Sequence, residues 1–275
     1  MNILIYGNGF LGNRIAAYTG GTIEKSRINR PEDLEQGPLP DIIVNAAGKT
    51  GRPNVDWCES HKDETYFANV TLTKLLAEHA KRHNIKLVHL SSGCIYEGDN
   101  DGRGWSEEDA PNFERSFYSH TKAEAERLLA SYDNTLIVRP RMPITSVPTE
   151  RNLINKLLAY NEVIVVPNSV TIIEDFLPSL GGLIASGKTG IYNLVNPEPV
   201  THKEILELYE TYAGTTLGKT YIEANVLKVA APRSNTILRT DKLEAAGFPM
   251  AHTRASLERV LKEYVANLNA GGDQN

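Results

Sequence analysis

The sequence predicts an α/β fold in which helices flank a parallel, doubly wound sheet. Short apolar runs alternate with longer helical runs over residues 2–139, which is the order expected of such a sheet. The first apolar run, residues 2–6, leads directly into a Gly-x-Gly-x-x-Gly motif and then into a helical run. These glycines permit a tight turn and let a pyrophosphate approach the helix N-terminus. A glycine-rich turn without a ligand is the alternative, and the position of the motif favours dinucleotide binding through Gly7, Gly9, Phe10, Leu11 and Gly12.

The other elements follow from apolar patterning and turn residues. Further strands are expected at 22–25, 41–45, 85–90 and 134–139, with helices at 62–83 and 118–132. After Pro140 the alternation loosens. Helices are expected at 152–160 and 174–186, and strands at 163–166 and 190–195. A further helix is expected to run through Tyr212, with Thr201 and Glu204 forming a capping box at its start. Two further helices end the fold, and residues 271–275 are expected to fray.

This pattern predicts two interleaved parts without a clean linker between them. Residues 1–145 are expected to form a dinucleotide-binding Rossmann core, which also contains the candidate catalytic residues Tyr118 and Lys122. Residues 146–275 are expected to form a smaller lobe that mainly binds and covers the substrate.

Composition excludes several classes of protein. The net charge of −5 over 275 residues indicates no basic surface for nucleic acid. No apolar run approaches the roughly 20 residues of a membrane span, and the N-terminal run is too short for a signal peptide. Two cysteines, Cys58 and Cys94, cannot build a disulfide framework, and free thiols fit a reducing cytoplasm. The histidines lack metal-ligand spacing, so we expect no catalytic metal.

Two further segments bear on the cofactor. Ala46, Ala47 and Gly48 follow the third strand, where small residues let the backbone lie close to a cofactor or pack tightly against a helix. The second strand ends near Ser26 and Arg27, which favour the 2′-phosphate of NADPH. Glu24 at the same strand end keeps NADH open as an alternative, and Arg27 also fits a solvated loop charge.

Tyr118 and Lys122 are the first candidates for catalysis. They are four residues apart, so a helix places them on one face. A tyrosine has a pKa of about 10, and a nearby cation lowers it, which suits proton exchange with a substrate oxygen. Ser92, at the end of the fourth strand, offers a hydroxyl to a substrate carbonyl. The alternatives are a solvated lysine beside a packed tyrosine, and a serine that caps a loop.

Taken together, these features resemble the extended short-chain dehydrogenase/reductases, and within them the dTDP-4-dehydrorhamnose reductase group. Longer strings resemble the bifunctional 3,5-epimerase/4-reductases of UDP-rhamnose synthesis known from plants. They lie at residues 50–61, 93–95, 139–144, 167–169, 190–193 and 231–235. The glycine loop is one residue shorter than the family's usual Gly-x-x-Gly-x-x-Gly, and Ser92 stands where relatives often have threonine.

The resemblance implies a substrate and a set of roles. The substrate would be a nucleotide-linked 4-keto-6-deoxyglucose, and the reaction 3,5-epimerisation followed by NADPH-dependent reduction at C4. Tyr118 would donate a proton to O4, Lys122 would bind the nicotinamide ribose, and Ser92 would orient the carbonyl. Cys94 and Lys156 would be the epimerisation acid/base pair, against the alternatives of inert packing and a solvated helix lysine. Residues implied in substrate binding are Arg52, Asn54, Trp57, Arg141, Asn168 and Arg233. Of these, Arg141 and Arg233 would bind the pyrophosphate, against the alternative that each forms a surface ion pair.

Several alternatives stay open at this level. The chain could act only as a reductase on an already epimerised 4-keto-rhamnose, or serve as a non-catalytic, cofactor-binding regulatory subunit. The sequence does not choose between UDP and dTDP, or between a monomer and a homodimer. The first 145 residues are taken up by the reductase-like core, so a separate 4,6-dehydratase is expected to supply the 4-keto sugar.

Overall fold

The central element is a six-stranded parallel sheet with the order β2-β1-β3-β4-β5-β9. The computed structural model describes the whole chain except residues 36, 227–228 and 273–275. The strands are β1 (Ile3–Tyr6), β2 (Thr22–Glu24), β3 (Ile42–Asn45), β4 (Lys86–Leu90), β5 (Thr135–Arg139) and β9 (Gly190–Asn193). This order confirms the predicted doubly wound α/β fold, because the chain reverses direction across the sheet between β1 and β3.

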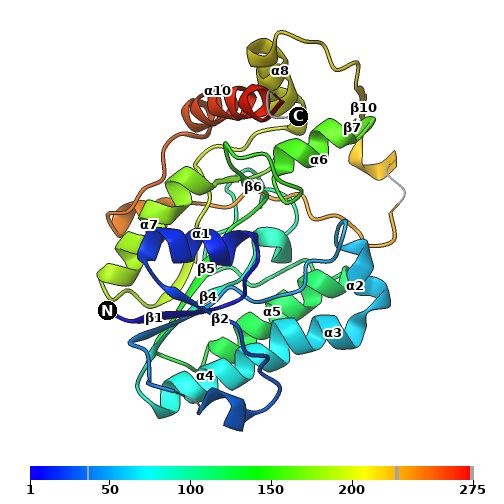
Figure 1. Ribbon diagram of the computed structural model, residues 1–275. Helices are drawn as coiled ribbons and strands as arrows, with labels where there is room; N and C mark the ends of the chain where they lie inside the picture. Colours follow the sequence, from blue (N-terminus) through cyan, green and yellow to red (C-terminus); the bar gives the residue numbers. More distant parts are fainter. Residues whose placement is uncertain (36, 227–228, 273–275) are drawn as a thin grey trace.

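Helices cover both faces of the sheet (Figure 1). On one face, α1 (Phe10–Thr19) lies against α7 (Ile173–Ala185), and the short α9 (Asp241–Ala245) packs near β9. Their apolar side chains share a core with the sheet that includes Ile5, Ile15, Val44 and Phe176. The other face is covered by α4 (Leu72–Arg82) and α5 (Phe117–Leu129), around Ile43, Leu76 and Leu87 among others.

The helix predicted over residues 62–83 is present from Lys62 to Arg82, and it contains a π-helical turn. A short helix α3 (Lys62–Tyr66) passes into a π-helical turn η2 (Phe67–Thr71) before α4 begins. The extra residue of the π turn brings Asn69 under the loop after β3, where its side chain bonds both backbone groups of Lys49. A short helix, α2 (Asp56–Ser60), also follows the loop after β3, where the turn-forming residues before it gave no sign of a helix.

A second layer of structure lies beyond the carboxyl ends of the strands. It holds α6 (Leu153–Ala159), α8 (His202–Ala213) and α10 (Thr253–Gly272), with the pairs β7 (Glu162–Ile164) and β10 (Thr220–Ile222), and β6 (Pro143–Ile144) and β8 (Thr171–Ile172). These elements share their own apolar core, which includes Leu157, Ile205 and Leu261. The predicted capping box of α8 is present between Thr201 and Glu204.

The second half of the chain does not stay in this upper layer. Before α8 it returns to the sheet through α7 and β9, so sheet and upper layer exchange segments (Figure 1). Short 3₁₀ turns complete the chain at Pro31–Leu34, Gly93–Ile95 and Ala224–Val226. The expectation of frayed residues 271–275 falls partly on residues 273–275, which lie outside the described part, while α10 continues to Gly272.

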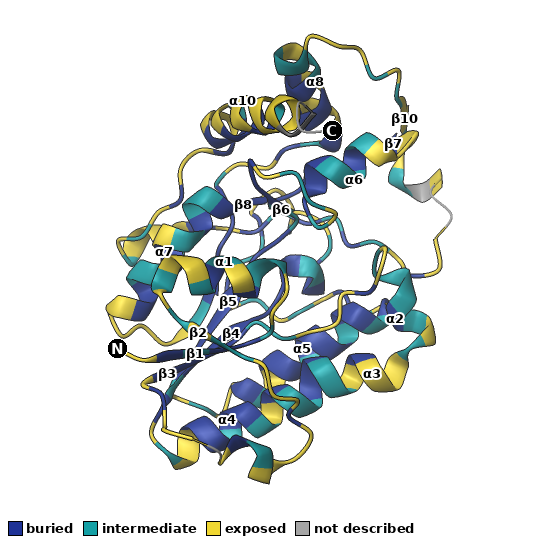
Figure 2. Cartoon of the chain, in the orientation of Figure 1, coloured by how far each residue is buried: buried dark blue, intermediate teal, exposed yellow. Residues whose placement is uncertain are grey.

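Burial follows this layering. Figure 2 shows the central strands β3, β4 and β5 largely buried and the outer faces of α3, α4 and α10 exposed. No helix in the described ranges is both long enough and apolar enough to cross a membrane.

Candidate active site

A large cavity of about 1060 Å³ lies between the carboxyl edge of the sheet and the upper layer. Its walls come from the glycine loop, the ends of β3, β4 and β5, the first turns of α5, and the segment around α6 and β7. Ligands bind at this edge in doubly wound sheets because the strand order reverses there.

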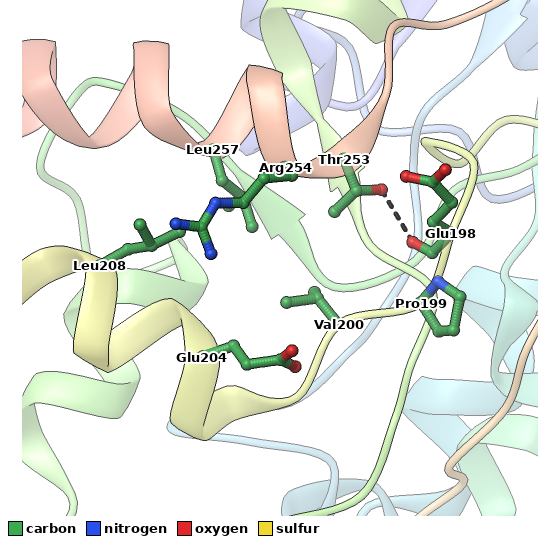
Figure 3. A pocket seen from close by; sticks show the side chains of 8 residues that line it. All are labelled: Glu198, Pro199, Val200, Glu204, Leu208, Thr253, Arg254 and Leu257. Atoms are coloured by element: carbon green, nitrogen blue, oxygen red, sulfur yellow. Dashed lines mark hydrogen bonds between the residues drawn. The ribbon is translucent and has the colours of Figure 1, made fainter.

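A second pocket lies between the N-terminal ends of α8 and α10 and is much smaller, at about 80 Å³ (Figure 3). Thr253 closes one side by donating a hydrogen bond to the Glu198 carbonyl oxygen, and Arg254 reaches over the other. Its volume is too small for a nucleotide sugar, which makes the large cavity the candidate site.

The glycine loop fits a bound dinucleotide. Gly7 has φ +110°, and a Cβ there would lie 2.5 Å from the Ala46 carbonyl carbon, while a Cβ on Gly12 would lie 1.8 Å from the Gly7 oxygen. Gly7 is therefore required for packing against the loop after β3, and Gly12 for the start of α1 to lie directly against Gly7. Gly9 differs, because a Cβ there would meet open space on the cavity side. No side chain caps α1, so its first N–H groups are free to bind a phosphate.

The other predicted cofactor contacts divide into two groups. Phe10, Leu11, Ala46, Ala47 and Gly48 line the cavity together with Gly9. By contrast, Arg27 is exposed and is not part of the cavity wall. The Glu24 carboxylate accepts a hydrogen bond from the Ser26 backbone N–H, at 2.7 Å, which lowers the pKa of Glu24. The Glu24 carboxylate is therefore engaged by the backbone of its own loop.

Tyr118 and Lys122 lie on the inner face of α5, and both side chains are buried at the cavity wall. Ser116 caps this helix by accepting the Ser119 N–H, which fixes the first turn and with it the direction of Tyr118. Ser92 also lines the cavity. Its Oγ accepts the Cys94 backbone N–H at 3.1 Å, so it caps a 3₁₀ turn while it faces Tyr118.

The effect of Lys122 on Tyr118 differs from the expectation. Burial raises the pKa of Tyr118, the charge of Cys94 adds to this, and the Ser92 hydroxyl works against it. The Lys122 ammonium points at the Leu90 carbonyl oxygen, 2.7 Å away. Burial lowers the pKa of Lys122 to about 8. In this structure Tyr118 is accordingly held in its protonated, proton-donating form, rather than shifted towards phenolate by Lys122.

Cys94 and Lys156 face the same cavity as Tyr118. Cys94 sits in the 3₁₀ turn after β4, and Lys156 is in the middle of α6, from the opposite layer. Burial lowers the pKa of Lys156, Arg151 adds to that effect, and Cys94 opposes it. An amine with a lowered pKa is better able to exchange protons near neutral pH than a solvated lysine is.

Two residues predicted to bind substrate have other contacts here. Arg141 is 1% exposed, and its guanidinium donates to the Asn168 side-chain oxygen and the Ser234 carbonyl oxygen, each at 2.6 Å. Asn168 is fully buried behind the cavity wall, and its amide also bonds Val166, Asn235 and Thr236. Arg141 lines the cavity, but most of its guanidinium and the Asn168 amide are engaged by these contacts within the protein.

The loop from Thr50 to Trp57 supplies part of the cavity mouth. Asn54 lines the cavity, but Arg52 is exposed and Trp57 stacks on His61 at 3.9 Å, and neither belongs to the cavity wall. Arg233 lines the cavity and forms a bidentate ion pair with Asp56, at 2.8 and 3.0 Å.

Two cavity residues carry no signal in the sequence. Arg151 lines the mouth and donates to the Gly51 carbonyl oxygen at 2.9 Å. His202 lines the cavity from the start of α8, and burial lowers its pKa to about 4, so its ring is neutral. A lone arginine in a loop and a histidine after a helix cap are common on protein surfaces, and only the tertiary contact brings them here.

One group of potential metal ligands occurs in the described ranges, at Glu35, His79 and His83. It lies outside the cavity wall, and Arg82 donates to Glu35 at 2.9 Å. The group therefore has no part in the site chemistry.

Comparison with known proteins gives consistent matches. The model of the RmlD substrate binding domain family matches residues 10–266. A bifunctional dTDP-4-dehydrorhamnose 3,5-epimerase/dTDP-4-dehydrorhamnose reductase of Arabidopsis thaliana is 42% identical over 88% of this chain and 86% of its own length. A trifunctional UDP-glucose 4,6-dehydratase/UDP-4-keto-6-deoxy-D-glucose 3,5-epimerase/UDP-4-keto-L-rhamnose-reductase of the same plant is 40% identical over 89% of this chain. The chain spans only 39% of that longer relative.

Solved structures agree with these matches. The L780 UDP-rhamnose synthase of Acanthamoeba polyphaga mimivirus is similar with a TM-score of 0.90 at 31% identity, over 96% of this chain and 99% of that one. A dTDP-4-dehydrorhamnose reductase of Bacillus anthracis, solved in complex with NADP, has a TM-score of 0.81 at 21% identity, over 96% and 99% of the two chains. At this identity the second similarity shows the shared fold.

The buried Lys122 leads to a prediction about stability. The unfolded chain keeps this ammonium up to a pKa of about 10.4, whereas the folded protein loses the proton near pH 8. The folded state binds fewer protons between these values, so stability rises with pH there. From pH 7.5 to 9.5 the unfolding free energy of the wild type should gain about 1–2 kcal/mol relative to Lys122→Met. Urea titrations of both ligand-free proteins test this. A difference in unfolding free energy that does not change with pH would show that the folded state does not lower the pKa of Lys122.

Proposed function

The chain belongs to the RmlD-like dTDP-4-dehydrorhamnose reductase family, and on this premise we propose that it converts UDP-4-keto-6-deoxy-D-glucose to UDP-L-rhamnose. The conversion is a 3,5-epimerisation followed by NADPH-dependent reduction of the C4 ketone. The observation that carries the proposal is the sharing of one cavity by two sets of proton-transfer groups. Ser92, Tyr118 and Lys122 form one set, and Cys94 and Lys156 form the other.

The first set suits the reduction. When bound along the glycine loop, the nicotinamide cofactor supplies a hydride equivalent to C4. Tyr118, held protonated by its burial, donates its phenolic proton to O4 as the C4 carbonyl becomes an alcohol. The Ser92 hydroxyl orients that oxygen. Lys122 keeps a positive charge at neutral pH beside the Leu90 carbonyl and supplies a donor to the cofactor ribose.

The second set suits the epimerisation. The protons on C3 and C5 are acidified by the C4 ketone, because their removal gives an enolate. One member of the Cys94–Lys156 pair removes the proton from carbon, and the electron pair of the C–H bond moves to O4. The other member delivers a proton to the opposite face of the same carbon. The two side chains come from opposite layers of the cavity, as inversion of configuration requires.

Cations at the mouth suit the anionic part of the substrate. Arg151 and Arg233 both line the cavity at the loop between β3 and α2. A guanidinium binds phosphate through two parallel N–H groups. The ion pair between Asp56 and Arg233 would hold the Arg233 guanidinium in position for such contacts. We assign the base as uracil because the relative solved at 31% identity is a UDP-rhamnose synthase, and a 4,6-dehydratase activity would supply the 4-keto sugar.

Solvent deuterium tests the proposal. Incubation of the enzyme with UDP-4-keto-6-deoxyglucose and NADPH in D₂O should give a rhamnose product labelled at both C3 and C5. An incubation without enzyme measures spontaneous exchange. A 4-reduced product without label at these carbons would show a reductase only, and turnover confined to an already epimerised 4-keto-rhamnose would show the same. Absence of any turnover would favour a non-catalytic role.

Tyr118 should be essential for the reduction. Tyr118→Phe should lower kcat for reduction of pre-epimerised 4-keto-rhamnose by about 10²–10⁴-fold, because the proton donor to O4 is lost. Tyr96→Phe is the matched control, since Tyr96 is also buried but its hydroxyl donates to the Asp109 carbonyl away from the cavity. Equal rates in the wild type and Tyr118→Phe would overturn this role.

A further inference from the structure

We propose that Arg141 is the positioning residue of Cys94, which holds the thiol at the cavity wall and stabilises charge on its sulfur during proton transfer at the sugar. The inference rests on the proposed function, in which Cys94 exchanges a proton with C3 or C5. It gives Arg141 a role different from the pyrophosphate binding expected from sequence.

The Arg141 guanidinium reaches the sulfur directly. Its Nη1 donates to Cys94 Sγ at 3.2 Å and to the Ser234 hydroxyl at 3.3 Å, while Nη2 donates to Asn168 and to the Ser234 carbonyl. The Asn168 amide is itself fixed by three further hydrogen bonds. The guanidinium is therefore oriented by fixed partners behind it, and within the described residues its one hydrogen bond to a potential acid/base group is the bond to Cys94.

The backbone before Cys94 is adapted to this contact. Gly93 lies against Arg141, where a Cβ would come within 3.4 Å of the Arg141 Cβ and Cδ and within 2.7 Å of a Leu238 methyl group. A larger residue would collide with the Leu238 methyl group, so glycine lets the turn that carries Cys94 lie between Leu238 and Arg141. The turn, the segment after β5 and the polar segment at Ser234 thus meet at one point.

The positive charge of Arg141 is not balanced by a carboxylate among the described residues. Within the described part of the chain it makes no ion pair, and all of its oxygen acceptors are neutral groups. Arg139, two residues earlier and equally buried, instead pairs with the Glu126 carboxylate at 2.6 Å. A buried cation without a counter-ion is costly. Negative charge on Cys94 during the reaction would provide that counter-ion, which explains why the position holds arginine.

The groups around Cys94 come from several elements. Arg141 faces it from the end of β5, Tyr118 and Lys122 from α5, and Lys156 from α6. His202 faces Arg141 from α8 and is neutral. Arg141 is the one cation among these that hydrogen bonds the sulfur. In the step itself, the C–H bond breaks, the S–H bond forms, and the electron pair moves to O4, while Arg141 keeps all its protons.

Thiol alkylation measures the contact without relying on turnover. Iodoacetamide modification of Cys94 is followed by peptide mass analysis from pH 6 to 9.5 in the wild type, Arg141→Met and Arg141→Lys. In Arg141→Met the midpoint of the pH profile should rise by at least about one unit, which is about tenfold slower modification at pH 7. Arg141→Lys keeps the charge and should shift less. Arg139→Lys is the matched control, because Arg139 is also a buried arginine but lies outside the cavity. It should not shift the pH profile of Cys94 modification.

Two readouts separate positioning from folding. Cys58 is fully buried, so its protection from iodoacetamide shows that each variant is folded. Deuterium incorporation by Arg141→Met should fall more than tenfold, with less than a threefold loss in reduction of pre-epimerised sugar. An unshifted alkylation profile in a variant that protects Cys58 overturns the inference, and so does loss of Cys58 protection in both Arg141 variants. A wild type that incorporates no deuterium, with the alkylation shift intact, would instead overturn the proposed function alone.

Discussion

Burial of two cations at the carboxyl edge of the sheet sets the chemistry of the cavity. Lys122 is held by the Leu90 carbonyl and Arg141 by Asn168 and Ser234, so both keep their charge close to the reacting groups without neutralising it in a direct ion pair. The nearby carboxylate, Glu126, pairs with Arg139 and accepts a hydrogen bond from the Ser91 hydroxyl. Positive potential is therefore left on the cavity side, where an enolate and an anionic nucleotide would gain from it.

This arrangement accounts for two reactions in one site. Both steps polarise the same C4 carbonyl, so a single pose of the sugar can serve them. Tyr118 and Ser92 lie on the sheet side of the cavity, while Lys156 belongs to the upper layer and Cys94 to the turn after β4. The chain passes from the sheet to the upper layer and back, so the two parts are not joined by a single linker. The distance across the cavity therefore depends on the packing of the whole chain rather than on one hinge.

Local patterns in the sequence predict much of this, and long-range contacts account for the rest. The glycine loop, the spacing of Tyr118 and Lys122, and the capping box of α8 depend on neighbouring residues, and the structure places them as expected. The direction of the Lys122 ammonium depends on Leu90, which is 32 residues away. The contacts of Arg141 join it to Ser234 across 93 residues. An arginine predicted for substrate thus becomes a wall residue for reasons that no local pattern contains, and the π turn at Asn69 was hidden in the same way.

The central claim is that one cavity holds two separable sets of proton-transfer groups. The most direct measurement compares two activities of Cys94→Ala, which are deuterium incorporation at C3 and C5 and NADPH-dependent reduction of pre-epimerised 4-keto-rhamnose. Cys58→Ala serves as the control thiol, since Cys58 does not line the cavity. The account predicts that Cys94→Ala loses incorporation at one or both carbons by at least about 10²-fold and keeps reduction near the wild-type rate. Loss of both activities to the same extent would contradict it, because Cys94 would then serve only the structure of the site.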